Sequence, residues 1–510
     1  MTPPDIYCIN SAAPDDSEDG EPLISNDTVP PQCCSVRFNL AILMFFGFCV
    51  VYGLRVNFSV ALVAMVNTTD PKPELNRSRV YDCPLPSVKE NTSQTFSQPD
   101  GIPQYTWESE TQGWLLGAFF FGYLCTQMPG GYLSSHYGGK FFLGVGVLST
   151  AVLTLLTPLA ASWGSRWLFA LRVLEGFTEG TTFPAMMAMW ARWAPPLERS
   201  RLLTLSGSGG TFGAFVSLLL TGYICQTLGW PAVFYCCGGA GCLWSVFWFI
   251  FVADDPHTHR RISKQERDYI TNSIGSQGTG HGWSVPLLAM LLSVPLWAII
   301  ITQMCSNWSY YILLTSLPTY MTDILHFDLQ SNGFLSALPY VGSLLVSVLS
   351  GIVADKLIER QVFTVTTVRK IFTLAGVLPG AAFLMAVNYT GCSHIMTVTF
   401  FTLSLTIGGI SSAGVFMNQI DIAPRYAGFL LGITNTFGTI PGAVAPIVTG
   451  YFTEDHSLTG WKKVFWVATG INAVGAVIFA IFGSGKLQQW AVTEEERAEA
   501  KTQRRSSVSA

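Results

Sequence analysis

Residues 202–253 read LLTLSGSGGTFGAFVSLLLTGYICQTLGWPAVFYCCGGAGCLWSVFWFIFVA and contain no Asp, Glu, Lys or Arg. A helix needs about 20 apolar residues to cross the hydrocarbon core of a membrane. This stretch therefore holds about two such helices joined by a short turn. Uncharged stretches recur at 269–322, 371–420, 426–453 and 464–485. We therefore expect the chain to cross a membrane many times.

The composition of the whole chain excludes other classes. Of its 510 residues, 49% are hydrophobic and only 12% are charged, against about 25% charged in an ordinary soluble domain. A net charge of −4 and the lack of a long basic stripe exclude a nucleic-acid binder. Long uncharged runs favour helices over the short alternating segments of a membrane barrel.

The sequence predicts an all-α membrane protein with twelve transmembrane helices in two six-helix pseudo-repeats. The predicted divisions are a disordered tail, an N-terminal half, a linker, a C-terminal half and a second tail, at 1–37, 38–253, 254–287, 288–490 and 491–510. The twelve spans are predicted at 38–66, 111–133, 140–161, 165–190, 202–224, 231–253, 288–320, 330–353, 370–389, 394–417, 426–451 and 464–485.

The distribution of Lys and Arg predicts the orientation. An even number of spans puts both termini on one side, and most Lys and Arg residues of the loops fall on that side, so we expect both termini to be cytoplasmic. The long polar loop 67–110 is then luminal. It carries three acceptor sequons, which predict glycosylation at Asn67, Asn76 and Asn91.

The two halves repeat each other. Ala194-Pro195 followed by Thr211-Phe212-Gly213 recurs as Ala423-Pro424 followed by Thr436-Phe437-Gly438. The loop expected after the second span, Gly131–Lys140, recurs after the eighth as Gly351–Lys356. Ordered recurrence favours duplication over unrelated glycine-rich helix ends. Two parallel six-helix halves are typical of a secondary transporter whose binding site lies between them near the membrane midplane.

These repeats resemble a known family. Gly131–Lys140 resembles the conserved cytoplasmic motif of the major facilitator superfamily, whose usual acidic residue is replaced by Ser135 here and kept in the second copy as Asp355. The resemblance implies that Lys140 and Asp355 belong to gating loops. Three further segments are similar to the anion/cation symporter family, solute carrier family 17, namely Trp193–Arg201, Leu54–Asn57 and Asn418–Gly428.

This family holds the vesicular glutamate transporters, the sodium–phosphate cotransporters and sialin. The segments 33–43, 307–311 and 317–321 are most similar to the sialin branch. That resemblance implies symport of protons with sialic acid and related acidic sugars or organic anions, out of lysosomes and by alternating access. Met187 stands where sialin has a His. Leu116 and Ser306 stand where the vesicular glutamate transporters have His and Arg.

Four charged residues lie inside predicted spans and away from their ends, where charges are costly and usually functional. Arg55 is expected to hold a substrate carboxylate with its guanidinium fork, or to form a structural ion pair with a Glu of the fourth span. Arg172, Glu175 and Glu179 have i, i+3, i+7 spacing and share one helix face. Arg172 is a second candidate for the substrate anion, or it pairs with Glu175 and fixes the helix.

Glu179 is the main candidate for proton coupling, and Glu175 is the second. Protonation of Glu179 would release Arg55 or Arg172 to bind an anion, and loss of the proton would restore the ion pair and help to eject it. Four uncharged polar residues are candidates for binding sugar hydroxyls, namely Asn307, Tyr311, Ser411 and Ser412.

The N-terminal tail contains Asp19-Gly-Glu-Pro-Leu23-Ile24, which resembles an acidic dileucine signal read by a sorting adaptor. We therefore expect a lysosomal membrane location, with the synaptic vesicle or plasma membrane as alternatives. Cys83 and Cys392 could form a luminal bridge. The other cysteines form no metal-binding pattern, and we expect no cofactor apart from protons as the coupling ion.

Other functions remain open at this point. One alternative is a sodium-coupled phosphate or urate-type carrier at the plasma membrane, and another is a vesicular transporter of acidic amino acids. A third is a substrate-gated receptor or channel that kept the fold and lost transport. An enzyme is not expected, because the spans contain no nucleophile–base arrangement or metal set.

Overall fold

The computed structural model describes residues 35–66, 102–195, 198–274, 286–423 and 426–491. Within these ranges, β structure is limited to one isolated bridge between Val66 and Tyr105. The helices are α1 (Val36–Met65), α2 (Ser109–Tyr137), α3 (Gly139–Leu155), α4 (Thr157–Trp163), α5 (Ser165–Glu179), α6 (Thr182–Trp193), α7 (Arg199–Thr227), α8 (Trp230–Phe251), α9 (Lys264–Ile274), α10 (Leu287–Leu291), α11 (Val294–Asp323), α12 (Leu329–Glu359), α13 (Val365–Ala386), α14 (His394–Gly408), α15 (Val415–Ile422), α16 (Ala427–Phe452) and α17 (Leu458–Phe482), with short 3₁₀ turns η2 (Val387–Tyr389), η3 (Gly409–Ala413) and η5 (Gln489–Ala491).

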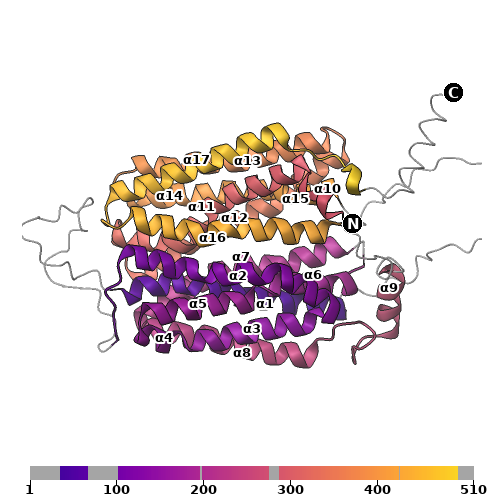
Figure 1. The fold of residues 1–510 in the computed structure, drawn as a ribbon, viewed down its shortest axis with the longest axis horizontal. Helices are drawn as coiled ribbons and strands as arrows, with labels where there is room; N and C mark the ends of the chain where they lie inside the picture. Colours follow the sequence, from indigo (N-terminus) through magenta and orange to yellow (C-terminus); the bar gives the residue numbers. More distant parts are fainter. Residues whose placement is uncertain (1–34, 67–101, 196–197, 275–285, 424–425, 492–510) are drawn as a thin grey trace, which may run out of the picture.

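The helices form two halves that lie against each other with their long axes roughly parallel (Figure 1). Helices α1 to α8 make one half, and α10 to α17 make the other. We call the end at which α1 begins and α17 ends the tail end, and the opposite end the distal end. Helix α9 stands apart at the tail end. The prediction of an all-helical chain in two halves is confirmed.

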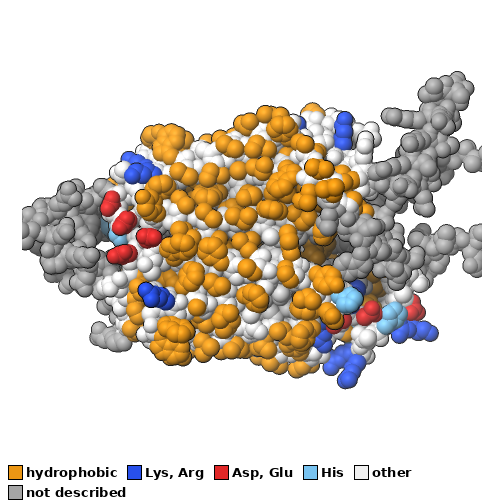
Figure 2. Space-filling model, in the orientation of Figure 1, with side chains coloured by type: hydrophobic (Ala, Val, Ile, Leu, Met, Phe, Trp, Pro, Cys, Tyr) orange, Lys and Arg blue, Asp and Glu red, His pale blue; other side chains and the backbone are white. Residues whose placement is uncertain are grey.

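Each predicted span coincides with one helix or with a run of consecutive helices. Among the described residues, eight helices are long and apolar enough to cross a membrane, or nine if α3 and α4 count as one span bent by 47°. Helices α2 and α11 have the length but not the hydropathy. Figure 2 shows a wide band of hydrophobic side chains around the middle, with charged side chains gathered at the two ends.

Four spans that the sequence predicted as continuous are divided, namely 140–161, 165–190, 288–320 and 394–417, and two of the breaks lie at glycines. The span at 165–190 divides into α5 and α6 next to Gly180, and the span at 394–417 divides at η3. At both breaks a glycine lets the backbone approach a neighbouring helix. A Cβ on Gly180 would lie 2.6 Å from the Tyr123 carbonyl oxygen, and one on Gly414 would lie 2.5 Å from the Thr373 nitrogen. Mean hydropathy does not detect such contacts.

The two repeated segments predicted as loops are mostly helical, so that prediction was wrong. Helix α2 continues to Tyr137 and α3 starts at Gly139, which leaves only Gly138 between them. The segment 351–356 lies inside α12. An apolar span ends where polar residues begin, whereas a helix continues into water as long as its backbone hydrogen bonds are satisfied.

The linker contains a helix that the sequence analysis did not predict, and it is fixed to the N-terminal half. Glu266 of α9 accepts hydrogen bonds from the backbone N–H groups of Val36 and Arg37, both at 3.1 Å. The Arg37 side chain pairs with Glu198 at 2.6 Å and with Glu266 at 3.2 Å. These bonds satisfy N–H groups that the first turn of α1 would otherwise leave without partners.

Two pairs of helices join the halves, α2 with α16 and α7 with α12. The pairs are related by the repeat, since each combines the helix of the second span of one half with the helix of the fifth span of the other. Both have glycines at their contacts near the distal end. A Cβ on Gly222 would lie 2.5 Å from the Leu329 carbonyl oxygen, and one on Gly113 would lie 2.5 Å from the Pro446 carbonyl oxygen. The backbones therefore meet directly there.

A glycine also sets the distance between α2 and α5, the helix that carries Arg172, Glu175 and Glu179. A Cβ on Gly176 would overlap the Phe119 carbonyl oxygen. We predict that Gly176→Ala forces the helices apart and lowers the free energy of unfolding by about 1–3 kcal/mol. Gly207→Ala in α7 is the matched control, because its Cβ would meet nothing within 4 Å. Equal unfolding midpoints in detergent for the two variants would contradict the prediction.

Candidate functional site

Three charged residues of α5, namely Arg172, Glu175 and Glu179, are buried. The exposed fraction is 2% for Arg172 and 0% for both Glu175 and Glu179. Their i, i+3, i+7 spacing puts all three on the face of α5 that turns toward the interior. Arg55 from the middle of α1 is also buried. The structure thus brings together the four charges that the sequence singled out within the spans.

Arg55 and Glu179 form an ion pair between α1 and α5. Glu179 Oε1 accepts hydrogen bonds from Arg55 Nη2 at 2.6 Å and from Arg55 Nε at 3.0 Å. The second carboxylate oxygen, Glu179 Oε2, is buried and has no hydrogen-bond partner among the described residues. A buried oxygen without a partner is uncommon. It leaves a place on Glu179 where a proton can be taken up.

Arg172 and Glu175 form a second, separate pair. Arg172 Nη1 lies 2.5 Å from Glu175 Oε2, and the other Glu175 oxygen accepts a hydrogen bond from the Thr157 hydroxyl at 3.2 Å. Arg172 also reaches α1, where its Nη2 donates to the Arg55 carbonyl oxygen at 3.4 Å. Both Glu175 oxygens have partners, so this pair has the features of a structural lock.

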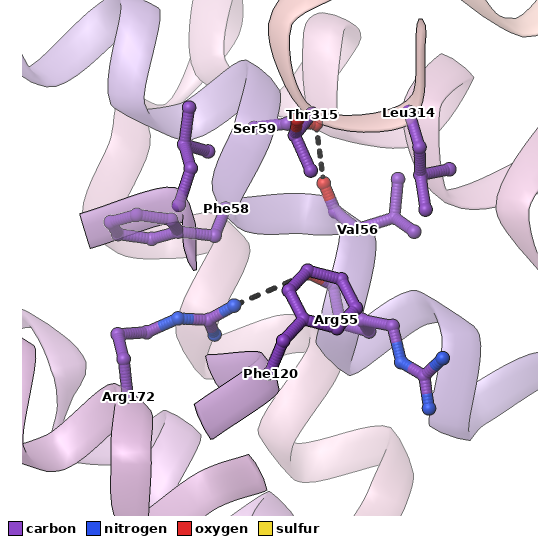
Figure 3. Close-up of a pocket in the computed structure, with 9 residues that line it drawn as sticks. Arg55, Val56, Phe58, Ser59, Phe120, Arg172, Leu314 and Thr315 are labelled. Carbon is purple, nitrogen blue, oxygen red and sulfur yellow. Dashed lines mark hydrogen bonds between the residues drawn. The ribbon is translucent and has the colours of Figure 1, made fainter. Parts of the chain in front are cut away.

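Figure 3 shows the two guanidinium groups pointing to different places. Arg172 points toward the backbone of α1, whereas the Arg55 side chain leaves α1 in another direction. The cavity between them has a volume of about 10 Å³, room for about one water molecule. An organic anion does not fit into this cavity as it stands.

Aromatic rings enclose both arginines. The Arg55 guanidinium carbon lies 4.6 Å from the ring centre of Tyr123, 4.8 Å from Tyr52 and 5.1 Å from Phe119. Arg172 lies 4.6 Å from the ring centre of Phe58. Rings of this kind stabilise a cation through their π faces. The sequence analysis did not single out Tyr123, Phe119 or Phe58.

Some of the aromatic rings around Arg55 could have been recognised from the sequence. Tyr52 and Phe58 stand three residues before and after Arg55 in the same helix, so they flank it on nearly the same face. The rings from α2 could not be found in this way, because nothing local in the sequence shows which helix packs against α1.

The C-terminal half contributes Tyr311. It is buried, it belongs to α11, and its ring centre lies 4.8 Å from that of Phe120 in α2. Leu314 and Thr315 of α11 line the cavity beside the two arginines. The candidate site therefore lies at the boundary between the halves, where the repeat predicted it.

The other predicted binding residues have partners of their own. The Asn307 side chain donates to the Gly438 carbonyl oxygen at 2.8 Å. Ser411 and Ser412 lie in η3 and donate to the carbonyl oxygens of Gly408 and Gly409. No hydrogen bond among the described residues links these three side chains to Arg55, and their role in binding stays a prediction.

The predicted gating residues lie at the tail end. The Lys140 backbone N–H donates to Asp254 Oδ1 at 2.7 Å, which ties the start of α3 to the end of the N-terminal half. Asp355 is exposed on α12. Met187 is half-buried in α6 and packs with the apolar core of the N-terminal half. These contacts place the residues without testing their roles.

Several predictions fall outside the described residues. Cys392 is disulfide-bonded, and every other cysteine that the structure describes is free. Its partner therefore lies outside the described ranges, and the pairing with Cys83 stays a prediction. The same holds for the predicted sorting signal and glycosylation sites, which are Asp19, Leu23, Ile24, Asn67, Asn76 and Asn91.

Comparison with known proteins adds independent information. The model of the Major Facilitator Superfamily matches residues 43–446. Sialin of Homo sapiens is 48% identical, covering 94% of this chain and 96% of its own. A probable small intestine urate exporter of Homo sapiens is 38% identical, with 90% and 92% covered. A bacterial homologue of the human lysosomal transporter Spinster has the same fold, with a TM-score of 0.67 at 11% identity and coverage of 89% and 99%.

The Arg172–Glu175 pair yields a stability prediction. Glu175→Gln leaves Arg172 buried without a counter-charge, and we expect it to lower the free energy of unfolding by about 3–5 kcal/mol. The double variant Arg172→Gln/Glu175→Gln removes both charges and should recover most of this loss. Unfolding in mixed micelles measures both. A double variant no more stable than Glu175→Gln would show that the pair is not the cause.

Proposed function

The chain belongs to the major facilitator superfamily and, within it, to the family that includes sialin, and we propose that it carries sialic acid and related acidic sugars together with protons. It is a multi-pass membrane transporter of small organic anions and not an enzyme. The finer proposal on substrate and coupling ion rests on 48% identity to sialin over 94% of the chain, together with the charge arrangement at the boundary between the halves.

The buried Arg55–Glu179 pair is the observation that carries the proposal. Arg55 is the cation best placed to receive a substrate carboxylate, because one oxygen of its partner Glu179 has no hydrogen bond, whereas both oxygens of Glu175, the partner of Arg172, are bonded. In this arrangement Glu179 occupies the Arg55 fork and competes with the substrate. A guanidinium fork matches any carboxylate, so substrate and Glu179 are alternative partners for the same donors.

Protonation of Glu179 would therefore couple proton and anion. A proton on Glu179 Oε2 neutralises the carboxylate and weakens its hold on Arg55, which is then free to bind the substrate. When the proton leaves toward the cytoplasm, Glu179 takes Arg55 back and the anion is released. Proton and anion move in the same direction, as symport requires.

We further propose that the distal end faces an acidic lumen and the tail end faces the cytoplasm, in the lysosomal membrane. The distribution of Lys and Arg and the three sequons between α1 and α2 support this orientation. The dileucine-type sequence at Asp19–Ile24 would be read by a sorting adaptor on the cytoplasmic side.

The direct test is uptake of labelled sialic acid into vesicles that contain the purified protein, with and without an inward proton gradient and in the absence of sodium. Proton-stimulated accumulation is expected. Uptake that requires sodium would favour a sodium-coupled phosphate or urate-type carrier. Failure to take up sialic acid in folded protein would overturn the substrate proposal, and glutamate, urate and phosphate would be tested next.

The role of Glu179 predicts a specific change in pH dependence. Glu179→Gln cannot take up a proton, and we expect its residual uptake or exchange to be independent of luminal-side pH between 5 and 7.5. Glu175→Gln is the matched control from the same buried helix face. Normalised to folded protein, it should keep the pH dependence. A Glu179→Gln protein with the wild-type pH profile would contradict the coupling role.

If Arg55 binds the substrate carboxylate, its substitution should weaken the binding of sialic acid and leave the coupling to protons unchanged. Arg55→Lys keeps the positive charge but removes the planar fork. We expect the concentration of sialic acid at half-maximal uptake to rise at least roughly tenfold, the effect of about 1.4 kcal/mol. The pH profile should stay as in the wild type. Unchanged affinity would mean that Arg55 does not contact the substrate.

A further inference from the structure

His456 links three elements at the distal end. It lies in the connection between α16 and α17, and its Nδ1 is 2.9 Å from Oδ2 of Asp323, the last residue of α11. Its Nε2 is 3.3 Å from the hydroxyl oxygen of Ser109, the first residue of α2. Asp323 and His456 belong to the C-terminal half and Ser109 to the N-terminal half, so the imidazole spans the boundary.

Both protonation states of the imidazole fit this geometry, but the hydrogen bonds that they make to Asp323 and Ser109 differ in strength. The Asp323 carboxylate only accepts, so Nδ1 carries a hydrogen in either state. In the neutral ring Nε2 accepts a hydrogen bond from Ser109. In the protonated ring Nε2–H donates to the Ser109 oxygen, and this contact becomes charge-assisted, about twice as strong as a neutral hydrogen bond. The contact with Asp323, which the carboxylate makes charge-assisted in either state, becomes an ion pair.

The charges around His456 also favour contact between the two halves when the imidazole is protonated. Asp323 ends α11, where the helix dipole already places negative charge. A positive charge on His456 would lie between Asp323 of the C-terminal half and the first turn of α2, which contains Glu110. Figure 2 shows acidic side chains gathered at this end. The charged residues near His456 on its connection and on the elements it joins are Glu454, Asp455, Lys462 and Lys463, Asp323, and Glu108 and Glu110.

Protons from solution can reach this site while the two halves are in contact at the distal end. The His456 side chain is 43% exposed, while that of Asp323 is 8% exposed. Histidine is the side chain that ordinarily changes its charge between pH 5 and 8. Glu179 is fully buried, so the two proton-binding positions are distinct in place and in access.

We propose that His456 is a luminal pH-responsive latch, in which protonation strengthens the contact with Ser109 and stabilises closure of the distal end. The proposal rests on the orientation in the proposed function, which exposes the distal end to the acidic lumen. A carrier loaded in an acidic lumen would then close behind its substrate more readily. At neutral pH the distal end would open more easily, so this second proton regulates the cycle without being carried through it.

The test measures closure itself rather than transport. Spin labels attached through p-acetylphenylalanine at Leu228 and Tyr389, both exposed at the distal end, report the distance between the halves and leave the twelve native cysteines intact. The protein is held in lipid nanodiscs at pH 7.5 and 5.5, in native and Glu179→Gln backgrounds. The second background removes the contribution of the coupling carboxylate.

Acidification should raise the ratio of closed to open protein about fivefold, the effect of one charge-assisted over one neutral hydrogen bond. His456→Asn should abolish this increase, and Ser109→Ala should reduce it by removing only the contact across the boundary. His394→Asn, a half-buried histidine at the same end, is the matched control and should keep it.

An increase that persists in His456→Asn would overturn the latch. Absence of the increase from a Glu179→Gln protein that keeps the native His456 would also overturn it. The result is independent of the substrate proposal. If sialic acid is not carried but the His456-dependent increase is present, only the proposed function fails. If uptake is proton-coupled and the increase is absent, only the latch fails.

Discussion

The Arg55–Glu179 ion pair is the interaction on which the rest of the site depends. Two opposite charges buried between α1 and α5 are stable only together, because either one alone would remain uncompensated in the interior. The rings of Tyr52, Tyr123 and Phe119 and the tight contact of α5 with α2 at Gly176 hold the pair in place. In the proposed function, neutralisation of Glu179 is what allows a carboxylate from outside to replace it.

The second pair shows why two arginines are present. Arg172 is held by Glu175 and Thr157 and contacts the α1 backbone beside Arg55. These contacts join α1 to α5, whereas the Arg55–Glu179 pair is the one that would exchange its partner in the proposed cycle. Of the two interpretations that the sequence allowed for Arg172, the contacts favour the one in which it fixes the helix.

Much of this arrangement could be predicted from the sequence, and the failures have clear causes. Long uncharged stretches predicted the spans because hydropathy is a local property, and the i, i+3, i+7 spacing of Arg172, Glu175 and Glu179 predicted a shared face. The breaks near Gly180 and in η3 depend on how closely another helix approaches. The rings of Phe119 and Tyr123 depend on which helices are neighbours. A single sequence contains no measure of either.

The glycine contacts between the halves have a mechanical consequence. At Gly222 and Gly113 the two halves meet backbone to backbone near the distal end, with no side chain in between that could change rotamer. Such a contact is incompressible on the scale of thermal motion. In the proposed alternating-access cycle it would limit how far one half can move against the other. The closed position is then set by the chain itself and not by the size of the cargo, so different anions would all travel through one and the same closed geometry.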